Sequence, residues 1–133
     1  MSDEQALPPA ALRPAVKTIC IVEDDESIGD FLVQALAQET PYEVVCLSDA
    51  LRAVELVKVL KPSLLLLDYL LPGINGIELY ERLHAIPELE QTPAILLTAS
   101  FPPRDRMRKL GLPLLQKPFD LDELLLAIQQ LLH

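Results

Sequence analysis

Leu-Leu-Leu-Leu-Asp-Tyr-Leu-Leu-Pro-Gly-Ile-Asn-Gly, residues 64–76, is the stretch that decides the fold of this chain. Four leucines end on Asp68, and a turn rich in proline, glycine and asparagine follows shortly after. A short apolar run that stops at turn residues is typical of a strand buried on both faces, as in a parallel sheet. Because an aspartate is rarely buried without a partner, Asp68 is the first candidate for chemistry.

The composition describes a single acidic domain. The 133 residues suffice for one domain with a core, and 50% of them are hydrophobic. The net charge of −9 argues against sequence-independent binding of nucleic acid and suits a cation site built from carboxylates. The sequence shows neither an apolar stretch of membrane-spanning length nor a signal-peptide pattern, so we expect a cytoplasmic protein without a membrane partner. We expect residues 1–16 to form a flexible tail and residues 17–133 to form the domain.

Hydrophobic periodicity predicts five strands that alternate with five helices. The expected strands cover residues 17–22, 42–47, 64–68, 94–98 and 114–116. The expected helices begin near Ile28, cover about 48–60, run from near Gly76 to before Pro87, lie between Pro103 and Gly111, and cover 121–132. This alternation predicts an α/β fold with a flavodoxin-like, doubly wound, five-stranded parallel sheet in the order 2-1-3-4-5. The fourth helix should be short, because Pro102 and Pro103 delay its start.

Several polar residues follow or end the predicted strands. These residues are Glu23, Asp24, Asp68, Thr98 and Lys117. The carboxyl ends of parallel strands lie at one edge of a sheet, and the crevice opens where strands one and three diverge. Asp24 and Asp68 should therefore face each other there. Each residue alone has an ordinary explanation as a helix cap, a solvated lysine or a packed threonine, so it is their convergence that indicates a site.

The same residue types favour phosphoryl chemistry. Clustered carboxylates repel one another unless a cation is present, and Mg²⁺ takes carboxylate, water and phosphate oxygens as ligands. A lysine supplies a positive charge to a phosphoryl group, and a threonine supplies a hydrogen-bond donor. Phosphoryl transfer depends mainly on positioning and charge neutralisation, and an aspartate can become an acyl phosphate. The pattern therefore predicts Mg²⁺-dependent phosphoryl transfer to Asp68.

The chain resembles the receiver domain of two-component response regulators, the CheY-like family. The matching stretches are Ile-Val-Glu-Asp-Asp-Glu (21–26), Leu-Leu-Asp-Tyr-Leu-Leu-Pro-Gly-Ile-Asn-Gly (66–76), Leu-Leu-Thr-Ala (96–99) and Lys-Pro-Phe (117–119). The resemblance covers everything from about Lys17 onward. It implies that Asp68 accepts a phosphoryl group from the phosphohistidine of a sensor histidine kinase or phosphotransfer protein. It thus implies a phosphorelay signalling domain, with self-catalysed phosphotransfer and autodephosphorylation as its only catalysis.

The resemblance also assigns roles to the remaining site residues. It implies a Mg²⁺ ion bound by Asp24, Asp68 and the backbone carbonyl of Leu70, with help from Glu23. It implies that Thr98 and Lys117 contact the phosphoryl oxygens and that the bond between Lys117 and Pro118 is cis.

The sequence departs from the family pattern where the signal would leave the domain. The family usually has an aromatic residue three positions before the lysine, and this chain has Leu114 there. Pro102 and Pro103 replace helix-forming residues, so the fourth helix should be short or displaced. Helix four, strand five and helix five form the face that the family commonly uses for homodimers and effector proteins. A basic cluster of Arg104, Arg106, Arg108 and Lys109 is interpreted either as a solvated helix face or as a docking site for an acidic partner.

Two other functions stay open on the sequence. A receiver that serves as a dimerisation or docking scaffold without responding to phosphorylation is favoured by Leu114 and the altered fourth helix. A phosphatase with an aspartate nucleophile is disfavoured, because such enzymes generally carry a second aspartate where this chain has Leu70. The sequence also leaves open which kinase acts on the domain and whether the domain stands alone or belongs to a longer regulator.

Overall fold

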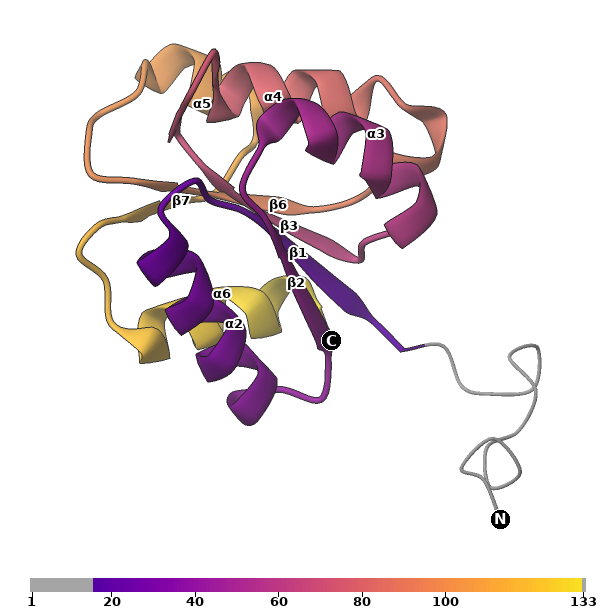
Figure 1. Cartoon of the computed structure of the whole chain (residues 1–133). Helices are drawn as coiled ribbons and strands as arrows, with labels where there is room; N and C mark the ends of the chain where they lie inside the picture. Colours follow the sequence, from indigo (N-terminus) through magenta and orange to yellow (C-terminus); the bar gives the residue numbers. More distant parts are fainter. Residues whose placement is uncertain (1–15, 133) are drawn as a thin grey trace.

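The computed structural model describes residues 16–132, so the expected tail lies outside the described part except for Val16. Figure 1 labels the main elements in chain order. The strands are β1 (Thr18–Val22), β2 (Glu43–Leu47), β3 (Leu64–Asp68), β4 (Leu70–Leu71), β5 (Ile74–Asn75), β6 (Ala94–Thr98) and β7 (Leu114–Gln116). The helices are α2 (Glu26–Glu39), α3 (Ala50–Leu60), α4 (Gly76–His84), the 3₁₀ turn η2 (Pro87–Leu89), α5 (Arg104–Leu110) and α6 (Leu121–Leu131).

One parallel sheet organises the molecule. Its order is β2-β1-β3-β6-β7, which is 2-1-3-4-5 when the five strands are counted along the chain. The predicted flavodoxin-like arrangement is confirmed. β3, the strand that ends on Asp68, lies at the centre, and all five of its residues are buried. A central strand covered on both faces explains why its sequence is continuously apolar instead of alternating.

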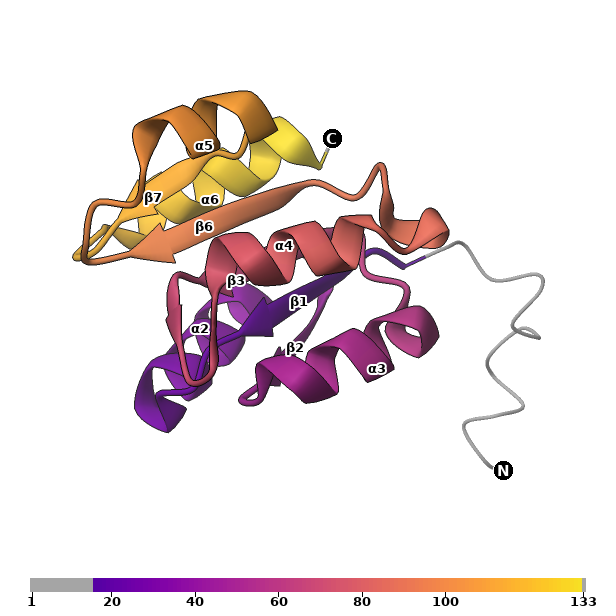
Figure 2. The same cartoon turned by 90° about the horizontal axis from the view of Figure 1, so that it is seen from above.

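Helices cover both faces of this sheet and divide the core in two. α2 and α6 lie on one face, and α3, α4 and α5 lie on the other (Figures 1 and 2). Successive side chains of a strand point to opposite faces. Leu64 and Leu66 of β3 therefore pack in the core beneath α2 and α6, whereas Leu65 and Leu67 pack in the core beneath α3 and α4.

Capping residues fix where the helices begin. The Asp25 side chain accepts the N–H of Ile28 at 3.0 Å and caps α2. Asp120 precedes α6, and its N–H donates to the Glu123 carboxylate at 3.1 Å. α3 begins two residues later than predicted, because Asp49 is its cap.

The segments around the sheet edge differ most from the sequence prediction. The hairpin of β4 and β5 and the turn η2 were not expected, because two or three residues are too short to show a hydrophobic period. α5 is short, as predicted, with seven residues, none of them fully buried. Among residues 16–132, no helix is long and apolar enough to cross a membrane.

Candidate functional site

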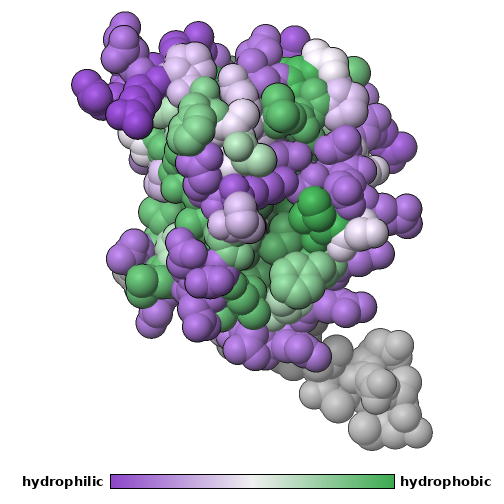
Figure 3. All heavy atoms as spheres, turned by 90° about the vertical axis from the view of Figure 1, so that its left-hand side faces the viewer, coloured by the Kyte–Doolittle hydropathy of each residue, from purple (hydrophilic) through white to green (hydrophobic). Residues whose placement is uncertain are grey.

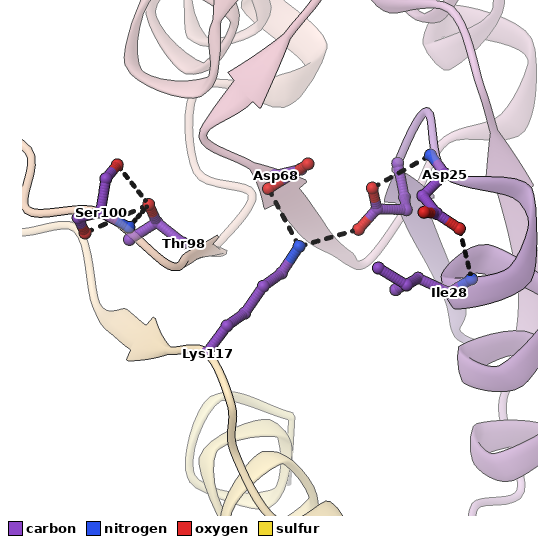
Figure 4. Close-up of polar contacts among 7 residues, drawn as sticks. Asp25, Ile28, Asp68, Thr98, Ser100 and Lys117 are labelled. Carbon is purple, nitrogen blue, oxygen red and sulfur yellow. Dashed lines mark hydrogen bonds and ion pairs between the residues drawn. The ribbon is translucent and has the colours of Figure 1, made fainter.

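Three charged side chains meet where β1, β3 and β7 end. Glu23 follows β1, Asp68 is the last residue of β3, and Lys117 follows β7. The Lys117 ammonium group donates to Glu23 Oε1 at 3.1 Å and to Asp68 Oδ1 at 3.2 Å. Figure 4 shows Lys117 extending to Asp68, with the contact between them drawn as a dashed line. The topology thus brings together residues that lie up to 94 positions apart in the sequence.

Burial strengthens the electrostatic interactions between these charges. Glu23 is 2% exposed and Asp68 is 7% exposed, so water screens them little. Burial raises the pKa of Glu23, and the Asp68 charge adds to this effect, although the Asp25 N–H and Lys117 oppose it. Burial lowers the pKa of Lys117, but Asp68 and Glu23 outweigh burial and raise it overall. The lysine is therefore held as a cation against the two carboxylates.

The carboxylates form a set of hard oxygen donors. One oxygen each of Glu23, Asp24 and Asp68 lies within 4.8 Å of the other two. Asp24 is exposed at the mouth of the site, whereas the other two carboxylates are buried. Three carboxylates against one lysine leave an excess of negative charge, and oxygen donors at this spacing fit a Mg²⁺ ion. Both oxygens of Glu23 already have protein partners, namely Lys117 and the N–H of Asp25 at 3.2 Å.

The loop after β3 holds the Asp68 backbone in place. The N–H of Tyr69 donates to the Leu97 carbonyl at 2.8 Å, and the N–H of Gly76 donates to the Tyr69 carbonyl at 2.8 Å. A Cβ atom at Gly76 would lie 2.5 Å from the carbonyl oxygen of Asp68, so only glycine fits there. Leu70, whose carbonyl is a predicted metal ligand, pairs with Asn75 in this hairpin.

Thr98 lies at the same edge of the sheet, at the end of β6, but its hydroxyl contacts Ser100. It is 1% exposed, and its hydroxyl oxygen accepts the N–H of Ser100 at 2.9 Å and lies 3.0 Å from the Ser100 hydroxyl. Figure 4 shows Thr98 and Ser100 grouped beside Asp68 and Lys117, with no interaction drawn between the two groups. The structure thus brings together Glu23, Asp24, Asp68 and Lys117, and it places the Thr98 hydroxyl against Ser100.

Ser100 was not predicted as a site residue. The available signal was the spacing, because threonine and serine side chains commonly accept the N–H two residues further along the chain. The carbonyl of Thr98 has a separate task, since it accepts the N–H of Lys117 at 2.7 Å and anchors the lysine backbone. The Lys117–Pro118 bond is cis, as the resemblance implied.

The two cysteines stand apart from this chemistry. Cys20 in β1 is fully buried, and burial raises the pKa of its thiol to about 12. Cys46 in β2 is half-buried behind Glu23, and burial also raises the pKa of its thiol. Both are free thiols. A raised thiol pKa disfavours the thiolate that binds metals or reacts with oxidants, so both residues act as small hydrophobic side chains.

Known proteins share both the sequence pattern and the fold. The model of the response regulator receiver domain matches residues 19–129. The phosphate regulon transcriptional regulatory protein PhoB of Rhizobium meliloti is 36% identical over 118 residues, covering 86% of this chain and 52% of that protein. The chain spans about half the length of the curated relatives it matches.

Solved structures of receiver domains are also similar to this chain. The non-phosphorylated HemR receiver domain from Leptospira biflexa has a TM-score of 0.74 and 31% identity, covering 86% of this chain and 93% of that one. The chemotaxis protein CheY4 of Vibrio cholerae has a TM-score of 0.81 over 89% of this chain and all of its own, and its 24% identity supports the fold alone. The family model matches the chain from β1 into α6, and the relatives described above share its sequence and fold. The chain therefore belongs to the family of receiver domains, the signalling domains of two-component response regulators.

Proposed function

We propose that Asp68 of this receiver domain accepts a phosphoryl group in a Mg²⁺-dependent reaction. The donor is the phosphohistidine of a sensor histidine kinase or of a phosphotransfer protein. The bond between the histidine nitrogen and phosphorus breaks, and a bond between an Asp68 oxygen and phosphorus forms. The observation that supports this proposal most directly is the contact of 3.2 Å between Lys117 Nζ and Asp68 Oδ1, with oxygens of Glu23 and Asp24 within 4.8 Å of an Asp68 oxygen. The domain extends over residues 17–133.

The residues of the chain divide this work. Asp24, Asp68 and the Leu70 carbonyl would hold the Mg²⁺ ion, and Glu23 would support it through a water molecule, because both its oxygens already have partners. The ion would neutralise charge on the phosphoryl oxygens. Lys117 is held as a cation by Glu23 and Asp68, so it is positioned to pair with a phosphoryl oxygen once Asp68 is phosphorylated.

Labelling with a small phosphodonor tests the acceptor. Incubation with acetyl phosphate and Mg²⁺ should add one phosphoryl group, measured by intact-protein mass spectrometry. Asp68→Asn should abolish the added mass, because an amide oxygen is a poor nucleophile. Asp105→Asn, which changes an exposed carboxylate on α5, is the matched control and should label like the wild type. Labelling of Asp68→Asn at the wild-type level would refute the assignment of the acceptor.

The output partner would contact the face formed by α5, β7 and α6. A groove of about 580 Å³ lies there between α5 and β7. Its apolar lining includes Phe101, which is 79% exposed, and Leu114, which is 40% exposed. Arg104 and Arg108 also line the groove, so a partner with acidic residues, either an effector protein or a second copy, would be matched in charge. Figure 3 looks at the side that is on the left in Figure 1 and shows apolar patches separated by hydrophilic residues.

A scaffold that does not respond to phosphorylation is the second candidate function. Leu114 in place of the usual aromatic residue, and the absence of any fully buried residue in α5, favour it. Beryllofluoride, which mimics the acyl phosphate, separates the two candidates. A switching receiver changes its oligomer mass or its effector binding when Mg²⁺ and beryllofluoride are added, whereas a scaffold keeps both constant.

A further inference from the structure

Within residues 16–132, the hydroxyl of Thr98 forms its hydrogen bonds with one residue, Ser100. It accepts the backbone N–H of Ser100 at 2.9 Å, lies 3.0 Å from the Ser100 hydroxyl, and donates to the Ser100 carbonyl at 3.2 Å. A hydroxyl has one proton to donate and two lone pairs to accept with. The three contacts with Ser100 therefore fill its bonding capacity. Because Thr98 is 1% exposed, little water is available to replace them.

This arrangement competes with the proposed role of Thr98. To donate to a phosphoryl oxygen on Asp68, the hydroxyl must withdraw its proton from Ser100. The Ser100 hydroxyl supplies one of the contacts that this movement breaks, and a substitution by alanine removes this contact alone. The other two involve the backbone of Ser100, so they are available with any residue other than proline at this position.

We propose that Ser100 is a positioning residue that holds the Thr98 hydroxyl away from the acceptor until a phosphoryl group is present. The inference rests on the proposed function, because it concerns the same site. The contact between the two hydroxyls stabilises only the unphosphorylated arrangement. Its strength therefore sets part of the free energy that phosphorylation must supply, and a ligand shifts the equilibrium only by its differential affinity for the two arrangements.

Removal of the Ser100 hydroxyl is the first test. Ser100→Ala keeps both backbone contacts and removes the contact between the side chains, so the free arrangement of Thr98 becomes easier to reach. Beryllofluoride should then bind about 2- to 10-fold more tightly in saturating Mg²⁺, the range that one net hydrogen bond corresponds to. Ser100→Thr keeps a hydroxyl at this position and should return the affinity to the wild-type value. An unchanged affinity in Ser100→Ala would overturn the proposal.

A double-mutant cycle shows whether the effect acts through Thr98. Thr98→Val has the same shape but no hydroxyl, so Ser100 has nothing to hold in that background. Ser100→Ala should then leave the beryllofluoride affinity unchanged, which gives a coupling equal to the whole effect of the single substitution. If Ser100→Ala tightens binding equally in the Thr98→Val background, the side chain acts by another route and the proposal is wrong.

The controls separate this inference from the proposed function. If the wild-type protein does not bind beryllofluoride, or if Asp68→Asn binds it equally well, the proposed phosphoacceptor fails before Ser100 is tested. If the wild type binds it through Asp68 and Ser100→Ala changes nothing, only the role of Ser100 fails. Thermal unfolding of each variant without beryllofluoride checks that the affinities are compared between folded proteins.

Discussion

Lys117 sets the charge balance of the site when no cation is bound. Its ammonium group donates hydrogen bonds to the side chains of both Glu23 and Asp68, and Glu23 is 2% exposed. Removing one partner of a buried charge leaves the other charge with its full desolvation cost. Lys117→Met should therefore lower the free energy of unfolding by about 1–3 kcal/mol in the presence of a chelator.

Chemical unfolding with and without Mg²⁺ measures this effect. Added Mg²⁺ should restore more stability to Lys117→Met than to the wild type, because the cation then has no lysine to compete with. Lys58→Met on the exposed side of α3 is the matched control, and its stability should stay within about 0.5 kcal/mol of the wild type. An equal response of both variants to Mg²⁺ would contradict the proposed cation site.

The protonation of Glu23 should make Mg²⁺ binding depend on pH. Burial raises the pKa of this carboxyl above its ordinary value of 4.5, so protons compete with the cation at a higher pH than for an exposed glutamate. The sign follows directly, because the affinity for Mg²⁺ falls as the pH falls through the raised pKa. Calorimetric titration at about pH 5 and about pH 7.5 should show weaker binding at the lower pH. Glu23→Gln should reduce the ratio of the two affinities, and an unchanged ratio would show that Glu23 plays no part.

The loop that begins α4 is an element whose shape depends on one glycine. A Cβ atom at Gly76 would lie 2.5 Å from the Asp68 carbonyl oxygen and 2.6 Å from Leu96 Cδ1. Gly76→Ala should therefore destabilise the fold by about 1–3 kcal/mol and slow labelling of Asp68, because the acceptor strand must shift. Gly111→Ala is the informative comparison, since its φ of 61° causes backbone strain but no atom lies within 4 Å of the added Cβ. It should cost stability without slowing the labelling, measured by acetyl phosphate uptake over time.

α5 should be the most easily opened helix of the domain. It has seven residues, none fully buried, and an ion pair between Arg106 and Glu81 joins it to α4. An exposed ion pair contributes at most about 1 kcal/mol, so tertiary contacts hold this helix weakly. Hydrogen exchange should show its amides exchanging faster than those of α2, which buries four residues. Equal protection of the two helices would mean that α5 is held by more than these contacts.

The elements also show what the sequence can and cannot predict. Strands such as β3 are predictable because burial on both faces demands an apolar run, and cap residues such as Asp25 leave a local signal. The convergence of the charged residues follows from the strand order, which the alternation of elements already predicts. The orientation of Thr98 does not follow, because whether its hydroxyl points to Ser100 or to the acceptor Asp68 depends on a side-chain rotamer and not on a pattern.

At the scale of the whole molecule, the sheet joins two cores into one cooperative unit. Leu36 of α2 lies in one core and Leu83 of α4 lies in the other, and both are 0% exposed. Each substitution by alanine should cost about 2–5 kcal/mol, and the two costs should add, because the residues lie in separate cores on opposite faces of the sheet. Urea unfolding of the single and double variants, followed by circular dichroism, should show one transition throughout. Two separate transitions would mean that the faces unfold independently.

The outer strands of the sheet have a consequence for the behaviour of the protein at high concentration. A strand at the edge offers unpaired backbone groups to which another chain can add, the first step of fibril growth. β7 offers three residues, with Pro113 immediately before it and Pro118 shortly after it, and proline has no N–H to donate. β2 at the opposite edge begins with the exposed, charged Glu43. Both edge strands of the sheet are thus poor templates for fibrils. A solution of the folded domain should therefore stay clear on prolonged storage.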